Sequence, residues 1–199
     1  MIEQENTQDT GLSDVLNILV QSTVETFEAA SHCQVTKGNV HKTTHTTPEY
    51  SVSFINELSG IVKGIMIITM PRKTAVEVAQ TVSKYRLDNA VFFIEGKADH
   101  SAVAEQIIDS LKQIVSDITD KVHEISAEKS IDLNCMTANY ILGESGNLRQ
   151  YGFQQYLVIN FHIADKGVFA LELGMTLTPK NERMARKIFK SRMSNAGEK

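Results

Sequence analysis

The sequence has little of what marks a disulfide-stapled or cysteine-ligated metal protein. Its 199 residues include no tryptophan, three prolines and two cysteines. Cys33 and Cys135 lie far apart and form no CxxC motif, which argues against a disulfide framework or a cysteine-based zinc site. Two isolated cysteines are typical of small core residues in a reducing compartment, so we expect a cytoplasmic protein.

Long hydrophobic runs are also missing. The longest strongly apolar run, residues 65–70, has the length of a strand and falls well short of the ~18–20 residues of a membrane span. The first residues, MIEQENTQDT, are polar and acidic, whereas a secretory signal is basic and then apolar. We therefore expect no membrane span.

Motifs for cofactors and metals are absent as well. The sequence contains no P-loop, Rossmann fingerprint, HExxH or GxSxG motif. His41 and His45 stand among threonines without an acidic or cysteine partner, which is a weak pattern for a metal site. We expect neither a metal nor a cofactor.

What is present is an ordinary globular composition with an uneven charge. Hydrophobic residues make up 42% and charged residues 22% of the chain, which has a net charge of −4. Residues 1–178 carry −9 and residues 179–199 carry +5. A strongly acidic domain makes nucleic acid an improbable partner, because phosphate binding requires clustered cations. We predict a disordered tail over residues 1–11, one domain over 12–178 and a basic extension over 179–199.

The hydrophobic periodicity predicts an α+β fold. Ser13 and Asp14 suit the N-cap of a first helix that reaches about residue 30, and Pro71 suits the first turn of a second. The expected strands are 34–44, 49–58, 65–70, 131–141, 156–163 and 168–177, and the further helices are 72–85 and 101–125. Residues 57–60 are expected to form a turn, 86–100 an irregular segment and 143–155 a polar loop. Strands joined as hairpins indicate a two-layer fold with a largely antiparallel sheet packed against long helices.

The helix 101–125 is the most informative segment. One face is apolar, with residues 107, 108, 111, 114, 115, 118, 122 and 125, and must lie on the sheet. A polar stripe lies on the opposite face and consists of Glu105, Asp109, Lys112, Ser116, Asp120 and His123. By itself this is a solvated helix surface with an Asp109–Lys112 pair worth about 0.2–0.5 kcal/mol.

The layout over residues 12–177 resembles the CheC/CheX/FliY family of chemotaxis proteins, and CheX in particular because there is one candidate motif helix. The resemblance is carried by the first amphipathic helix, the hairpin LSGIVKG at 58–64, the long helix and the last strand GVFALEL at 167–173. It implies dephosphorylation of the receiver domain of the response regulator CheY. The family signature, E-x-x-N with a Gly four residues after the Asn, falls on Asp109, Lys112 and Ser116. A register that starts at Glu105 would place Ile108 at the Asn position, on the buried side.

The resemblance implies roles for these residues. Asp109 and Lys112 stand at the catalytic positions, and Glu105, Ser116 and Asp120 at partner-binding positions. The implied partner is a phosphorylated CheY-like receiver domain, and a homodimer formed through edge strands is expected. Three interpretations stay open: a phosphatase of the receiver's phospho-Asp, a catalytically silent adaptor or dimerisation module, and a sensor of a small ligand.

Overall fold

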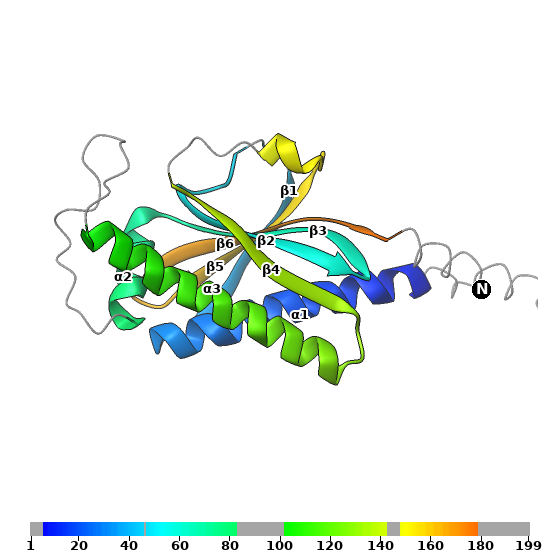
Figure 1. The fold of residues 1–199 in the computed structure, drawn as a ribbon, viewed down its shortest axis with the longest axis horizontal. Coiled ribbons are helices and arrows are strands. Elements are labelled where there is room, and N and C mark those ends of the chain that lie inside the picture. Colours follow the sequence, from blue (N-terminus) through cyan, green and yellow to red (C-terminus); the bar gives the residue numbers. More distant parts are fainter. Residues whose placement is uncertain (1–5, 46, 83–101, 143–147, 179–199) are drawn as a thin grey trace, which may run out of the picture.

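A computed structural model describes residues 6–45, 47–82, 102–142 and 148–178 (Figure 1). The predicted α+β class is confirmed. The elements are α1 (Asn6–Ser31), β1 (Val35–Thr43), β2 (Val52–Gly60), β3 (Val62–Met70), α2 (Arg72–Val82), α3 (Ala102–Glu128), β4 (Leu133–Leu142), the short 3-10 helix η1 (Leu148–Tyr151), β5 (Tyr156–Ile163) and β6 (Gly167–Leu177). The described strands form one sheet in the order β1-β5-β6-β3-β2-β4, and every neighbouring pair is antiparallel.

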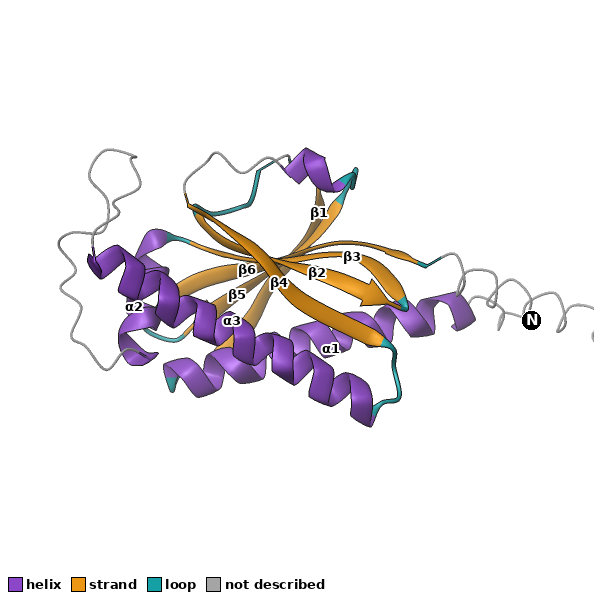
Figure 2. Cartoon of the chain, viewed as in Figure 1, coloured by secondary structure: helices purple, strands orange, loops and turns teal. Residues whose placement is uncertain are grey.

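The three α-helices form a layer on one face of the sheet, where α1 and α3 lie side by side (Figure 2). The main hydrophobic core fills the space between this layer and the sheet. All eight apolar positions predicted for the long helix are buried there: Ile107, Ile108, Leu111, Ile114, Val115, Ile118, Val122 and Ile125. Because this face is committed to the core, the polar stripe of α3 necessarily points away from it.

The other face of the sheet carries a second, smaller core. Ile55 on β2 and Ile65 and Ile67 on β3 pack there with Leu148 of η1 and Tyr156 of β5. The prediction of a polar loop over 143–155 is therefore wrong at Leu148, and the first half of β2 is buried on both faces. The cause is Leu148, which is almost fully buried and whose carbonyl accepts a hydrogen bond of 3.1 Å from the Tyr156 hydroxyl.

Helix α1 begins earlier than its sequence indicated. It starts at Asn6, so Ser13 and Asp14 lie inside the helix and the N-cap predicted there is wrong. Once a helix is nucleated, each added residue gains a hydrogen bond at little cost, which allows a polar segment to extend it. Residues 1–5, the irregular segment 86–100 and the basic extension 179–199 lie outside the described residues, and the division of the chain at 11 and 178 stays a prediction.

The β2–β3 hairpin is longer and tighter than expected. The turn predicted over 57–60 is still strand, and the chain reverses around Gly60 and Ile61. Gly60 has φ = +105°, and a Cβ there would collide with the carbonyl oxygen of Asp132. Only glycine tolerates both conditions, so Gly60 allows the chain to reverse within a single residue between the end of β2 and the start of β3.

Candidate functional site

The candidate site is the outer face of α3. Lys112 Nζ lies 3.1 Å from Asp109 Oδ1, and the two side chains are 45% and 71% exposed. Ser116 and Asp120 continue the same exposed face towards the C-terminal end of the helix. The structure therefore brings Asp109 and Lys112 into contact, as the spacing predicted. The side chain of Glu105 lies outside the described residues.

An aromatic residue that the sequence reasoning missed completes this pair. The Tyr140 ring on β4 has its centroid 4.9 Å from Lys112 Nζ and is 42% exposed. The sequence predicts a regular strand over 131–141, in which the Tyr140 side chain would point to the face opposite Leu133 and Cys135. In the structure Leu133, Cys135 and Tyr140 all lie on the helix side of the sheet, so the strand contains a phase shift that its own sequence does not reveal. Such a shift is the signal of a β-bulge.

His123 has a structural contact instead of a free position on the stripe. Its Nε2 accepts a hydrogen bond of 3.1 Å from the backbone N–H of Cys135, which joins the end of α3 to β4. Cys135 itself is fully buried, and burial raises the pKa of its thiol to about 12. A thiol with that pKa stays protonated near neutral pH and is no nucleophile.

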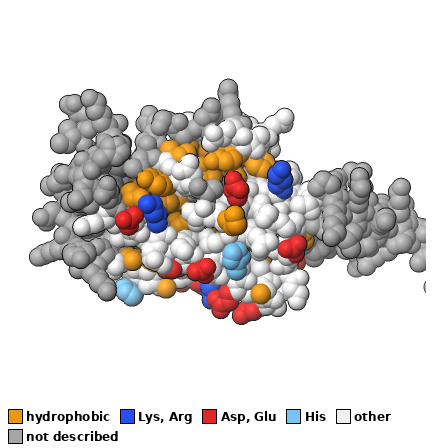
Figure 3. Space-filling view, viewed as in Figure 1, with side chains coloured by type: hydrophobic (Ala, Val, Ile, Leu, Met, Phe, Trp, Pro, Cys, Tyr) orange, Lys and Arg blue, Asp and Glu red, His pale blue; other side chains and the backbone are white. Residues whose placement is uncertain are grey.

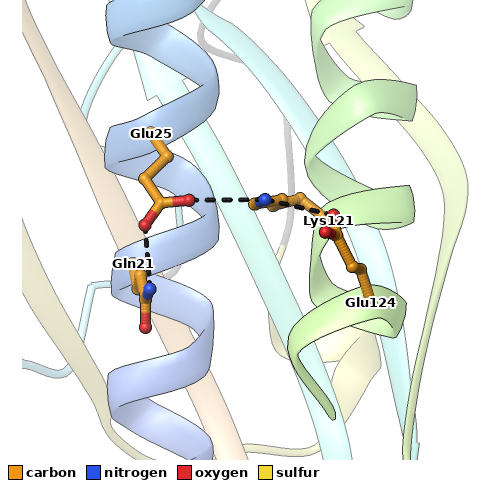
Figure 4. A network of polar contacts seen from close by, with 4 residues as sticks. All are labelled: Gln21, Glu25, Lys121 and Glu124. Atoms are coloured by element: carbon orange, nitrogen blue, oxygen red, sulfur yellow. Dashed lines mark hydrogen bonds and ion pairs between the residues drawn. The ribbon is translucent and has the colours of Figure 1, made fainter. Parts of the chain in front are cut away.

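Asp120 lies on the same helix face as the Asp109–Lys112 pair, nearer the C-terminal end of α3. It lines a shallow groove of about 610 Å³ between α1 and α3, together with Glu25, Asp117, Lys121 and Glu124. Lys121 Nζ lies 3.6 Å from Glu25 and 3.1 Å from Glu124, and Gln21 donates to Glu25 at 2.8 Å (Figure 4). Four carboxylates around one lysine make this groove acidic. Asp120 thus borders this acidic groove, about two helical turns from Lys112.

The described ranges hold neither a metal-binding cluster nor a membrane-spanning helix. No group of three or more His, Cys, Asp or Glu side chains there has the geometry to hold a metal ion. His41 is exposed on β1. None of the described helices is both long and apolar enough to cross a membrane.

A buried carboxylate lies on the sheet face opposite the helices. Glu172 on β6 is 1% exposed, and its carboxylate accepts a hydrogen bond of 2.6 Å from the backbone N–H of Glu49. Burial raises the pKa of Glu172 to about 7, although the Glu49 hydrogen bond opposes that change. Glu172 therefore ties the segment before β2 to the centre of the sheet with a group that titrates near neutral pH.

The raised pKa predicts a pH dependence of stability. The folded protein binds the Glu172 proton more tightly than the unfolded chain, so the free energy of unfolding falls as pH rises from about 4.5 to 7 and stays reduced above 7. Glu172→Gln keeps an acceptor for the Glu49 N–H and removes the charge. We expect this variant to be more stable than wild type by about 1–3 kcal/mol at pH 8, in urea unfolding followed from pH 4.5 to 8.

The exposed Glu57 on β2 provides the matched control. Glu57→Gln should reproduce the wild-type dependence on pH, since its charge is already solvated in the folded state. A Glu172→Gln curve that runs parallel to the wild-type curve over this range would contradict the assignment of the slope to Glu172.

Comparison with known proteins shows which of them share this fold. No family model and no curated protein matches the sequence. Solved structures do match: CheX of Borrelia burgdorferi, in a complex with CheY, BeF3 and Mg2+, is 18% identical with a TM-score of 0.63 and covers 80% of this chain and 96% of that one. CheX of Desulfovibrio desulfuricans is 14% identical, with a TM-score of 0.61 and coverages of 81% and 99%.

A third structure, the CheC-like protein of Shewanella oneidensis, is 17% identical, with a TM-score of 0.57 and coverages of 82% and 98%. These likenesses extend over nearly the whole length of each matched chain, at identities that carry information on the fold alone. The chain therefore has the fold of the CheC/CheX-like chemotaxis proteins.

Proposed function

We propose that this protein binds the phosphorylated receiver domain of a CheY-like response regulator through the outer face of α3. The proposal rests on one observation: the residues at the signature positions, Asp109 and Lys112, form an exposed contact pair on the long helix of a CheX-like fold. The CheX of Borrelia burgdorferi forms a complex with CheY, which supports a partner of this class.

The pair offers two charges to such a partner. The Asp109 carboxylate can accept hydrogen bonds from a cationic group of the receiver. The Lys112 ammonium can stabilise the negative charge on the oxygens of the phosphoryl group while that group is transferred to water. On this basis the first candidate function is a phosphatase of the receiver's phospho-Asp.

The second candidate is an adaptor that binds the receiver and leaves the phosphoryl group in place. A specific observation favours it: Lys112 has three donors and no acceptor, so it cannot hold a water molecule by donating and accepting as an amide does. Its Nζ is already engaged by Asp109 and by the Tyr140 ring. Lys112 therefore does not supply the water-orienting group that an amide at this position would supply.

One experiment tests both candidates. We expect wild type to bind a phosphorylated receiver domain, and Asp109→Ala and Lys112→Ala each to weaken binding about tenfold or more, because both remove a charge at the centre of the surface. Lys63→Ala on β3 is the matched control, since this exposed lysine lies outside the α3 face. Titration calorimetry measures binding, and loss of labelled phosphate measures decay.

The outcomes separate the proposals. Faster receiver decay with wild type supports the phosphatase, and unchanged decay with demonstrated binding supports the adaptor. Wild type that does not bind the phosphorylated receiver contradicts both candidates. If binding occurs and neither substitution weakens it, the partner docks elsewhere on the fold.

Two further expectations from the sequence stay predictions. They are a homodimer and a cytoplasmic location. The homodimer would use an edge strand, and the edges of the described sheet are β1 and β4.

A further inference from the structure

Tyr140 is unusual among the described side chains because it is both large and exposed. Only Val40, Met136 and Tyr140 among the described large hydrophobic residues are strongly exposed. Tyr140 alone of these contacts the candidate site, where its ring faces Lys112. Figure 3 shows the face of the molecule over α3 and β4, on which hydrophobic side chains lie next to cationic and acidic ones near the start of α3.

A β-bulge in β4 places the ring there. The β2–β4 pairing shifts between Ile55 and Asn56, which pair with Asn139 and Thr137, so one residue of β4 is left over. The extra residue reverses the phase of the strand and puts Tyr140 opposite Phe54, on the helix side of the sheet.

The bulge is fixed by its neighbours. Asn56 is fully buried, its amide donates to the Met66 carbonyl at 3.3 Å, and its Oδ1 accepts from the Thr137 hydroxyl at 3.0 Å. The ring lies next to that of the fully buried Phe54, its partner on β2, with a centroid separation of 6.2 Å. A locked backbone and a rigid aromatic neighbour hold the Tyr140 ring in place.

This arrangement restricts Lys112. A free lysine side chain samples many rotamers, and ordering it on binding costs conformational entropy. In this protein Lys112 Nζ is held from two sides, by the Asp109 carboxylate at 3.1 Å and by the Tyr140 ring face. A cation over an aromatic face is attracted by the electrons of the ring. The ammonium is thereby set on the outer face of α3 before any partner arrives.

We propose that Tyr140 is a positioning residue that holds the Lys112 ammonium where the phosphoryl group of the receiver docks, and so makes binding selective for the phosphorylated receiver. This inference rests on the proposed function. To the proposed site on α3 the inference adds a residue of β4, and it explains why the Lys112 side chain is ordered. Tyr140 acts through Lys112, so its effect requires both the ring and the ammonium.

The test compares phosphorylated with unphosphorylated receiver binding to variants of the full chain. Tyr140→Leu keeps apolar bulk and removes the ring, and we expect it to weaken binding of the phosphorylated receiver by about 3- to 30-fold, with little change for the unphosphorylated one. Tyr140→Phe keeps the ring face and should stay within about threefold of wild type. In a Lys112→Ala background, Tyr140→Leu should have almost no further effect.

Two controls make the result specific. Met136→Leu changes the other exposed hydrophobic side chain of β4, which lines a groove on the opposite sheet face, and should leave both affinities unchanged. The NMR shifts of the Lys112 side-chain protons should show a ring-current displacement in wild type and Tyr140→Phe that disappears in Tyr140→Leu.

The proposal is overturned if Tyr140→Leu binds the phosphorylated receiver as wild type does, or if it weakens binding equally with and without Lys112. In both cases wild type still binds, so the proposed function survives. Wild type that binds no receiver while the ring-current displacement is present overturns the proposed function, and the selectivity assigned to Tyr140 with it.

Discussion

Replacement of Lys112 by Asn is expected to accelerate the decay of a bound phosphorylated receiver domain by about 100-fold. Lys112 stands where the resemblance places the Asn of the signature, and it lies on the exposed face of α3, where the side chain can change without disturbing the core. An amide both donates and accepts, so it can hold a water molecule in line with the phosphorus atom. Correct placement of the attacking water supplies much of the catalysis in such a reaction, because it lowers the activation barrier.

The gain must come from the amide and not from the loss of the lysine. Lys112→Leu also removes the ammonium and its contacts with Asp109 and Tyr140, yet it provides no group that holds water. We therefore expect the phosphorylated receiver to decay no faster with Lys112→Leu than with wild type, in single-turnover measurements with saturating protein. Equal decay with Asn and Leu at this position would show that the residue at 112 does not orient the water.

Asp109 and Ser116 limit how much Lys112→Asn alone can accelerate the decay of the receiver. Asp109 is one methylene shorter than the Glu of the signature, and Ser116 adds a side chain where the signature has Gly. Both are exposed on the same helix face. The phosphorylated receiver should therefore decay faster with the triple variant Asp109→Glu, Lys112→Asn and Ser116→Gly than with Lys112→Asn alone.

The α3 part of the site was predictable because a helix has a fixed phase. The core residues Leu111 and Val115 fix the rotation of the helix, and that rotation places Asp109 and Lys112 together on the outside. The same argument excluded the register that starts at Glu105, since Ile108 is buried. Long amphipathic helices carry this information in their own sequence.

The β4 part of the site depends on an event that the local sequence does not specify. Tyr140 reaches Lys112 only because Asn56, on a strand far away in the chain, stabilises the bulge through Thr137. His123 likewise gains its structural role from the backbone N–H of Cys135. Both contacts arise where a helix meets a strand, and periodicity within one segment says nothing of either.

The sheet shows the same division between local and tertiary information. The strand 156–163 agrees with prediction, because the alternation of apolar and polar side chains is a local signal. The second core was missed since its cover, Leu148, lies within a segment of polar neighbours. A single buried residue in a polar loop leaves no periodic pattern.

Phe169→Ala is expected to lower the free energy of unfolding by about 3–5 kcal/mol, the largest stability effect predicted for this chain. Phe169 on β6 is fully buried between two rings. Its centroid lies 4.2 Å from that of Phe27 on α1 and 4.9 Å from that of Phe161, its direct partner on β5. Removal of the central ring leaves a cavity where the helix layer meets the sheet, and it breaks both stacking contacts at once.

Graded variants separate the cavity from the stacking. Phe169→Leu fills most of the volume and removes only the ring contacts, so urea unfolding should show a loss of about 1–2 kcal/mol. Phe153→Ala alters a partly exposed ring on the opposite sheet face and should cost about 1 kcal/mol. A Phe169→Ala loss as small as that of Phe153→Ala would mean that the helix layer closes over the gap, and that the three-ring stack does not couple α1 to the sheet.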